Sequence, residues 1–217
     1  MLIAREAHAS GLLDEIVRRS HKAGMAPRIV PRAELDRLAP GNHQGVVVVA
    51  RPYRYSSLES LLSAAAVGLL FADGIMDPQN LGSLLRSALG AGFNGVVIPS
   101  HRAAGVTPAV RRVSAGAAEL LGVARVTNLA RAIEDAKSSG LWVVGMDQAA
   151  EDVMWTSDLM NPPVALVVGA EDRGISRIVR QRCDGLVRIP QQGRLGSLNA
   201  GVAGALGMFE VARRVSA

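Results

Sequence analysis

From residue 67 onward, short apolar runs alternate with segments of helical periodicity, and this alternation restricts the fold more than any other feature of the sequence. The runs occupy residues 67–72, 95–98, 123–126, 141–146, 164–168 and 186–189. Strands that are apolar throughout are typical of parallel sheets covered on both faces, because neither face meets water. The alternation therefore predicts an α/β domain over residues 65–217, with a mostly parallel sheet and helices on both faces.

Helix signals lie between these runs. Thr107 precedes Pro108, a residue favoured at the first helical position, and Asn128 precedes a helix expected to end at Gly140. Further helices are expected over residues 81–89 and 176–182. Each would serve as the crossover that a parallel pair of strands requires.

Residues 1–52 are expected to form a separate small α/β unit. Ser10 can cap a helix whose apolar residues follow a 3.6-residue period, and the β-branched run at residues 46–50 predicts a buried strand. The unit is small for an independent domain and begins directly at a strand, so we expect it to be truncated. Residues 53–64 are predicted to be a linker and the first helix of the larger domain.

Composition excludes several classes of protein. The chain has 217 residues, of which 49% are hydrophobic and only 3% aromatic. No apolar run is long enough to span a membrane, and the start does not resemble a signal peptide. One cysteine, Cys183, allows no internal disulfide, and four scattered histidines show no metal-ligand spacing. We therefore expect a cytoplasmic protein with no metal and no membrane partner.

The charge favours a polyanionic partner. The net charge is +5, the sequence pI is about 10.3, and arginine supplies nearly all the basic side chains. A guanidinium group binds phosphate through two parallel hydrogen bonds, which suits an RNA backbone. A basic soluble enzyme without such a partner would have the same charge and stays an alternative.

Polar residues follow or flank three of the predicted strand ends, where ligands of parallel sheets gather. Asn80 and Arg86 belong to the segment after the first strand and lie off the apolar stripe of its helix. Glu171 follows the strand that ends near Gly169. As structural alternatives, Asn80 could cap the helix, Arg86 could be solvated or ion-paired, and Glu171 could pair with Arg173 or cap the next helix.

The third of these segments, residues 189–210, combines polar and very small side chains. It leaves a strand at Ile189, passes Gly193, and is expected to enter a helix near Ser197. Interior glycines cost a helix about 1 kcal/mol each relative to alanine, so their number calls for a reason. Tight packing on the sheet and close approach of a ligand are both adequate reasons.

One tempting motif does not carry its usual function. Gly90, Gly92 and Gly95 fit the G-x-G-x-x-G pattern of dinucleotide-binding proteins. That pattern must follow a strand and open a helix, so that the helix N-terminus meets a phosphate. Here a helix precedes the glycines and a strand follows them, which excludes a Rossmann dehydrogenase site.

The three segments together resemble the SpoU, or TrmH, branch of the SPOUT class of RNA methyltransferases. The matching motifs are Asp-Pro-Gln-Asn-Leu-Gly-Ser-Leu-Leu-Arg-Ser-Ala at residues 77–88, Val-Gly-Ala-Glu at 168–171, and Ile-Pro at 189–190 followed by Ser-Leu-Asn at 197–199. They occur in the family's order over roughly residues 67–213. After Ser-Leu-Asn the family usually has Val-Ser, where this chain has Ala200 and Gly201.

The resemblance implies a fold and an oligomeric state that periodicity does not show. Members of the family thread their C-terminal segment through a loop to form a trefoil knot, and they work as homodimers. The first 52 residues resemble the family's small RNA-binding domain, which is similar to the ribosomal L30e fold, without its usual first helix and strand.

The resemblance also implies the reaction, which is transfer of a methyl group from S-adenosyl-L-methionine to a ribose 2′-hydroxyl of RNA. It assigns the catalytic step to Arg86, with Asn80, Glu171, Ser197 and Asn199 orienting the reacting groups. A further set, expected to hold the cofactor largely through the backbone, comprises Gly169, Ile189, Leu198 and Gly193. Because guanidinium resists deprotonation, stabilising an alkoxide or clamping a phosphate is the easier role for Arg86.

The RNA that is methylated stays open at this point. The segments at residues 100–109 and 123–129 resemble enzymes that act on a guanosine of 23S rRNA, so rRNA is the first expectation. A transfer-RNA 2′-O-methyltransferase and an antibiotic-resistance rRNA methylase are the alternatives within the enzyme class. A non-catalytic RNA- or ribosome-binding protein is the alternative outside it.

Overall fold

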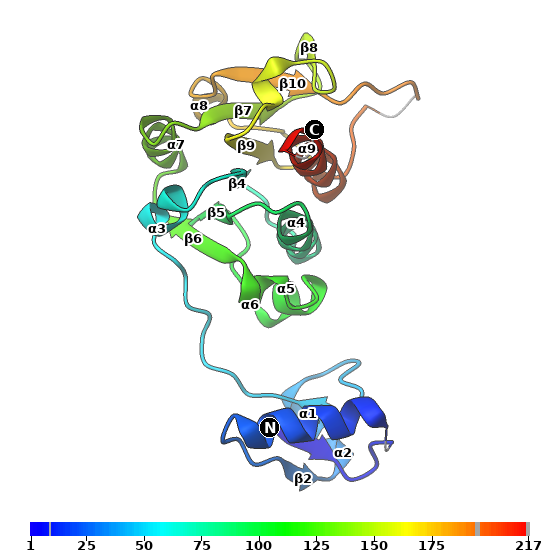
Figure 1. Ribbon diagram of the computed structural model, residues 1–217. Coiled ribbons are helices and arrows are strands. Elements are labelled where there is room, and N and C mark those ends of the chain that lie inside the picture. The colour runs from blue at the N-terminus through cyan, green and yellow to red at the C-terminus, as the bar shows by residue number, and fades with distance from the viewer. Residues whose placement is uncertain (9, 194–195, 216–217) are drawn as a thin grey trace. The chain divides into compact units, whose positions relative to one another are not determined.

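The computed structural model describes residues 1–8, 10–193 and 196–215, in two compact units (Figure 1). The units are Met1–Pro52 and Tyr53–Ala217. The larger unit contains a seven-stranded sheet of order β6-β5-β4-β9-β7-β10-β8, and every pairing in it is parallel. Its strands are β4 (Gly68–Asp73), β5 (Gly95–Pro99), β6 (Gly122–Val126), β7 (Trp142–Met146), β8 (Asp152–Val153), β9 (Val164–Gly169) and β10 (Gly185–Arg188). The predicted parallel α/β fold is confirmed.

Helices cover both faces of this sheet, as predicted. Along β4, Leu70 and Ala72 belong to one apolar cluster, whereas Leu69 and Phe71 belong to another. The first cluster lies under α4 (Pro78–Gly90), α5 (Pro108–Val113), α6 (Ala117–Leu120) and α9 (Ala200–Val215). The second lies under α3 (Leu58–Ser63), α7 (Leu129–Ser138) and α8 (Arg177–Arg180). The alternation of side chains along each strand thus supplies two cores from one sheet.

The helix starts confirm some expectations and correct others. The side chains of Thr107 and Asn128 accept hydrogen bonds from the first turns of α5 and α7, as expected of N-caps. Asp77, rather than Asn80, caps α4, because its Oδ1 accepts a hydrogen bond of 3.0 Å from the backbone nitrogen of Gln79. Asn80 therefore lies within the first turn of α4, and its side chain is available for other contacts.

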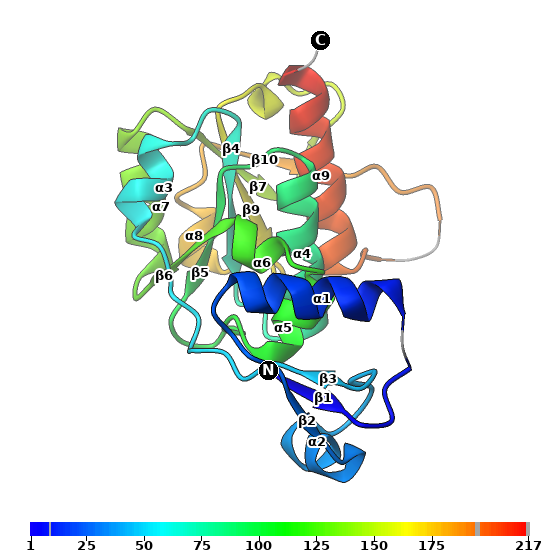
Figure 2. The same ribbon diagram turned by 60° about the horizontal axis from the view of Figure 1, so that its bottom comes forward.

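The C-terminal helix α9 begins at Ala200, not near Ser197 as expected. Its interior glycines are explained by packing. A Cβ atom at Gly201 would lie 3.2 Å from the Ser83 side chain of α4, and one at Gly207 would lie 2.6 Å from Met146 Sδ. A Cβ atom at Gly204 would overlap the buried side chain of Leu84. Figure 2 shows α4 and α9 side by side, and the glycines permit that close approach.

The far end of α9 is held by Arg214. Its guanidinium donates hydrogen bonds of 2.7–3.0 Å to the backbone oxygens of Met154, Trp155 and Ser157. It also donates to the buried carboxylate of Glu210 at 2.7 Å. Hydrogen bonds from Arg213 and Arg214 lower the pKa of Glu210, which keeps this carboxylate charged. The helix is therefore fixed to the segment that follows β8.

The smaller unit has a three-stranded sheet of order β2-β1-β3. Its elements are β1 (Leu2–Ala4), α1 (Gly11–Lys22), β2 (Arg28–Val30), α2 (Arg32–Leu38) and β3 (Val46–Val47). The expected buried strand at residues 46–50 is wrong in extent and in burial, since Val48 and Val49 are 52% and 77% exposed. Strand β1 pairs with β3 only at Leu2 and Ile3, so it offers no partner backbone for a longer β3.

Two expectations from the resemblance concern topology. Residues 194–195, within the segment that a trefoil knot would thread, lie outside the described residues, and the knot stays a prediction. The likeness of the smaller unit to an L30e fold stays a prediction as well. None of the helices described is both long enough and apolar enough to cross a membrane.

Candidate functional site: a polar cluster beside an apolar pocket

Three of the predicted site residues, from three separate segments, form one hydrogen-bonded cluster. Asn199 Nδ2 donates to Asn80 Oδ1 at 2.7 Å and to Glu171 Oε2 at 3.0 Å. Asn80 Nδ2 is 3.5 Å from the same oxygen of Glu171. Asn80 comes from the first turn of α4, Glu171 follows β9, and Asn199 immediately precedes α9. Residues more than ninety positions apart thus meet at one edge of the sheet.

The orientation of Asn199 is set by its second role. Its Oδ1 accepts hydrogen bonds from the backbone nitrogens of Gly201 at 3.0 Å and Val202 at 3.3 Å, so Asn199 is the N-cap of α9. With the oxygen turned to the helix, the amide nitrogen must point away from it, toward Asn80 and Glu171. One side chain therefore both starts the helix and joins the other two motifs.

Glu171 is exposed and points its carboxylate at these two amides. The alternative pairing with Arg173 is wrong, because the ion pair of Arg173 is to Asp172, at 3.7 Å. The alternative capping role is wrong too, since Ser176 is the N-cap position of α8. A carboxylate that accepts from two amides still has lone pairs free to accept further hydrogen bonds.

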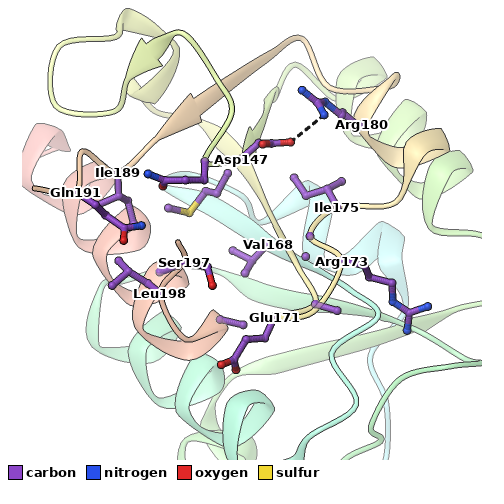
Figure 3. A pocket seen from close by; sticks show the side chains of 17 residues that line it. Asp147, Val168, Glu171, Arg173, Ile175, Arg180, Ile189, Gln191, Ser197 and Leu198 are labelled. Carbon is purple, nitrogen blue, oxygen red and sulfur yellow. Dashed lines mark ion pairs between the residues drawn. The ribbon is translucent and has the colours of Figure 1, made fainter. Parts of the chain in front are cut away.

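A pocket of about 360 Å³ adjoins the cluster (Figure 3). It lies beyond the carboxyl ends of β9, β7 and β10, which are neighbours in the sheet. Among its lining residues are Gly169, Glu171, Ile189, Ser197 and Leu198, all predicted site residues. Gly193 is not one of them: it is exposed, and a Cβ atom placed there would meet nothing within 4 Å.

The pocket has an apolar floor and a polar rim. Val168, Ile175 and Ile189 supply apolar surface to it, and Glu171 lies at one end in Figure 3. An ion pair between Arg180 Nη1 and Asp147 Oδ2, of 3.2 Å, lies at the opposite end. A pocket of this size and character suits a small organic molecule with an aromatic part and charged groups.

Gly169 is required by the protein's own backbone. A Cβ atom there would overlap the backbone of Gly174 and Ile175, which folds back over the end of β9. Packing of the protein's own backbone is therefore sufficient reason for a glycine here. Any larger residue would displace the segment at 170–175, and that segment carries Glu171 and lines the pocket.

Arg86 stands apart from the cluster. It is exposed on α4, and it makes no hydrogen bond or ion pair with the part of the chain that the structure describes. Six residues of helix separate it from Asn80 by about 9 Å along the axis. Long helical side chains point back toward the N-terminus, so its guanidinium can reach toward the end of α4 that carries Asn80.

The sequence interpretation missed the wall of the pocket formed by Met146, Asp147 and Gln148. They directly follow β7, and the rule that ligands gather at the carboxyl ends of strands would have identified them. Arg180, on α8, carried no comparable signal. Cys183 is not a candidate nucleophile, because burial raises the pKa of its thiol to about 12.

Comparison with known proteins places this site in a family. Residues 68–209 match the model of the SpoU rRNA methylase family, and residues 1–56 match a model described as RNA 2′-O ribose methyltransferase substrate binding. A 23S rRNA (guanosine-2′-O-)-methyltransferase, RlmB of Pseudomonas syringae pv. tomato, is 43% identical over 191 residues, which cover 86% of this chain and 76% of the relative. An uncharacterized tRNA/rRNA methyltransferase of Mycolicibacterium paratuberculosis is 41% identical over 220 residues, which cover 99% and 71%.

Solved structures agree with these relatives. An rRNA methyltransferase of Sinorhizobium meliloti with bound AdoMet matches with a TM-score of 0.82 and 25% identity, over 99% of this chain and 80% of that one. The SpoU methyltransferase AviRb of Streptomyces viridochromogenes matches with a TM-score of 0.78 and 28% identity, over 99% and 81%. The resemblance drawn from the three motifs is confirmed, and the chain belongs to the SpoU family of RNA methyltransferases.

Proposed function

We propose that this protein methylates the ribose 2′-hydroxyl of a guanosine in 23S rRNA, with S-adenosyl-L-methionine as the methyl donor. The observation that carries the proposal is the cluster of Asn80, Glu171 and Asn199 at the rim of a pocket of cofactor size. The named activity of the Pseudomonas relative supports guanosine in 23S rRNA. The mycobacterial relative is named for tRNA and rRNA alike, and tRNA is the second candidate.

The pocket residues fit S-adenosyl-L-methionine. The apolar side chains of Val168, Ile189 and Leu198 suit the faces of an adenine ring, and the polar rim suits hydroxyl, amino and carboxyl groups. When bound, this cofactor supplies a methyl group activated by its positively charged sulfur. The protein's part is to hold the ribose hydroxyl in line and to help it lose its proton.

Glu171 and Asn199 are placed for the first of these tasks. The Glu171 carboxylate is oriented by amide donors and can accept a hydrogen bond from a hydroxyl group. Ser197 lines the same pocket and presents a hydroxyl there. Arg86 stays cationic at neutral pH, so it acts by stabilising the developing alkoxide or by clamping a phosphate rather than by accepting the proton.

We propose in addition that the protein is a homodimer that pairs through α9 and α4. Val202, Leu206 and Phe209 recur at helical spacing on α9 and are 37–51% exposed, and Leu89 of α4 is exposed as well. A second copy of the same apolar face would bury these side chains, as a two-fold interface requires.

Asn199→Ala should strongly reduce methyl transfer, and Asn128→Ala provides the matched control. Both changes remove an N-cap and should cost about 1 kcal/mol of stability, measured by urea unfolding. Only the first removes the amide that donates to both Asn80 and Glu171, and it should lower turnover about a hundredfold. The assay is transfer of a radiolabelled methyl group to rRNA from a strain lacking this protein. Equal activity of the two variants would refute the role of the cluster.

Gly169→Ala should abolish cofactor binding, because the added methyl group overlaps the backbone of Gly174 and Ile175. Gly193→Ala should leave affinity unchanged, since nothing lies within 4 Å of the added atom. Isothermal titration calorimetry with S-adenosyl-L-methionine measures both. Unchanged affinity in Gly169→Ala would place the cofactor elsewhere.

Arg86→Ala should abolish methyl transfer while S-adenosyl-L-methionine still binds with nearly normal affinity, because Arg86 does not line the pocket. Arg86→Lys keeps the positive charge and should recover part of the rate. Single-turnover kinetics with saturating RNA separate the methyl-transfer step from binding of the substrates. Full turnover in Arg86→Ala would remove this residue from the catalytic step.

Leu206→Glu should convert the protein to a monomer in sedimentation velocity, because it places a charge in the proposed interface. Ile178→Glu is the control, since Ile178 is 64% exposed on α8, on the opposite face of the sheet. A wild-type protein that sediments as a monomer, or a dimeric Leu206→Glu variant, would exclude this interface.

A further inference from the structure

The segment after β5 carries two exposed basic residues that no part of the site already described uses. They are His101 and Arg102, and neither makes a hydrogen bond or an ion pair with any residue in the described ranges. Arg102 has φ of +55°, a left-handed conformation that residues with a side chain adopt only at a cost. Such strain persists where surrounding contacts enforce it, and it is common at binding sites.

The backbone of Arg102 and the segment that carries Glu171 both lie close to Gly74. The two approach each other at Gly74, whose φ is +71°. A Cβ atom at Gly74 would lie 3.9 Å from Ala170 Cβ and 4.0 Å from the carbonyl oxygen of Arg102. The Ala104 backbone nitrogen also donates to Ile75 O at 2.8 Å. The segments after β4, β5 and β9 therefore converge at one point, next to the polar cluster.

Contacts on the other side fix this segment. Arg125 Nη2 donates to Ser100 O at 2.8 Å, and the Val106 backbone nitrogen donates to the Tyr55 hydroxyl at 3.0 Å. The Arg125 guanidinium also lies over the Tyr55 ring, 5.6 Å from its centre. Both ends of the segment that bears Arg102 are thus tied to one arginine–tyrosine pair.

A second exposed cation lies near the point where the segments after β4, β5 and β9 meet. Arg173, two residues after Glu171, directs Nη2 to within 4.0 Å of Met76 Sδ, in the segment after β4. Arg102 and Arg173 thus belong to the two segments that approach Gly74. A ribose that reaches Glu171 brings a phosphate on each side of it, and an arginine is the side chain best suited to bind one.

We propose that Arg102 binds an RNA phosphate next to the ribose that is methylated, and that Tyr55 and Arg125 act as positioning residues for it. The inference rests on the proposed function, because it presumes that RNA reaches the polar cluster. It assigns to the segment at residues 100–106 the part of substrate recognition that follows the RNA backbone rather than the base.

The test compares Arg102→Ala with the wild-type protein in methyl transfer to rRNA from a strain lacking this protein. We expect the KM for RNA to rise about tenfold, the amount lost with one charge-assisted hydrogen bond. The affinity for S-adenosyl-L-methionine should not change, and kcat at saturating RNA should change less than threefold. The logarithmic salt dependence of RNA affinity should fall by about one ion. A disturbed fold alone would not produce this combination.

Two further variants complete the design. Tyr55→Phe keeps the ring and removes the acceptor of the Val106 hydrogen bond, so it should raise the KM for RNA by a smaller factor while leaving the salt dependence unchanged. Arg213→Ala removes the same charge at the opposite end of α9, about 20 Å from Asn199, and should leave the KM for RNA unchanged.

The outcomes separate this inference from the proposed function. A wild-type protein that methylates no RNA would overturn both. A wild-type protein that methylates RNA, with Arg102→Ala equal to it in KM and in salt dependence, would overturn the phosphate site alone. An equal loss in Arg102→Ala and Arg213→Ala would show a general effect of charge and would also overturn it.

Discussion

The site depends on a single amide side chain. The side-chain oxygen of Asn199 accepts a hydrogen bond from the first turn of α9, and its nitrogen donates to Asn80 and Glu171. Without it, the start of the C-terminal helix, the first turn of α4 and the segment after β9 have no shared polar contact. The helix cap made by Asn199, a stabilising interaction of ordinary size, is thus coupled to the assembly of the site. Aspartate or serine could also cap the helix, but neither offers an amide donor to the other two residues.

The glycines of α9 serve packing rather than contact with a ligand, although the helix begins beside the pocket. Gly201, Gly204 and Gly207 face Ser83, Leu84 and Met146, respectively, so they bring the helix against α4 and the sheet. At residue 201 the departure from the family's usual serine fits this packing, because a Cβ atom there would lie 3.2 Å from the Ser83 side chain. It is Ala200 and Ala203 that line the pocket. The glycines of α9 therefore serve packing, whereas two alanines of the same helix line the pocket.

Sequence reasoning predicted the larger unit well, because its strands are buried on both faces and therefore continuously apolar. It could not predict β8, which has two residues and no apolar run, and it overextended β3, where partner backbone rather than side-chain preference sets the length. Three of the five predicted catalytic residues meet in one cluster, and Ser197 lines the adjoining pocket. This meeting could be predicted from the sequence because the three motifs occur in the family's order. Neither the cap role of Asn199 nor the isolation of Arg86 was visible without coordinates, because both depend on where α9 and α4 begin.

Arg214 helps to fix the position of one wall of the pocket. The helix that forms one of its walls is held at its start by Asn199 and at its end by four hydrogen bonds from one guanidinium group to residues outside the helix. Contacts at both ends thus fix the position of α9. The remaining walls of the pocket include loop residues between β9 and α8, among them Ala170, Glu171 and Ile175, so substitutions in that segment can change the shape of the pocket while both anchors of α9 stay in place.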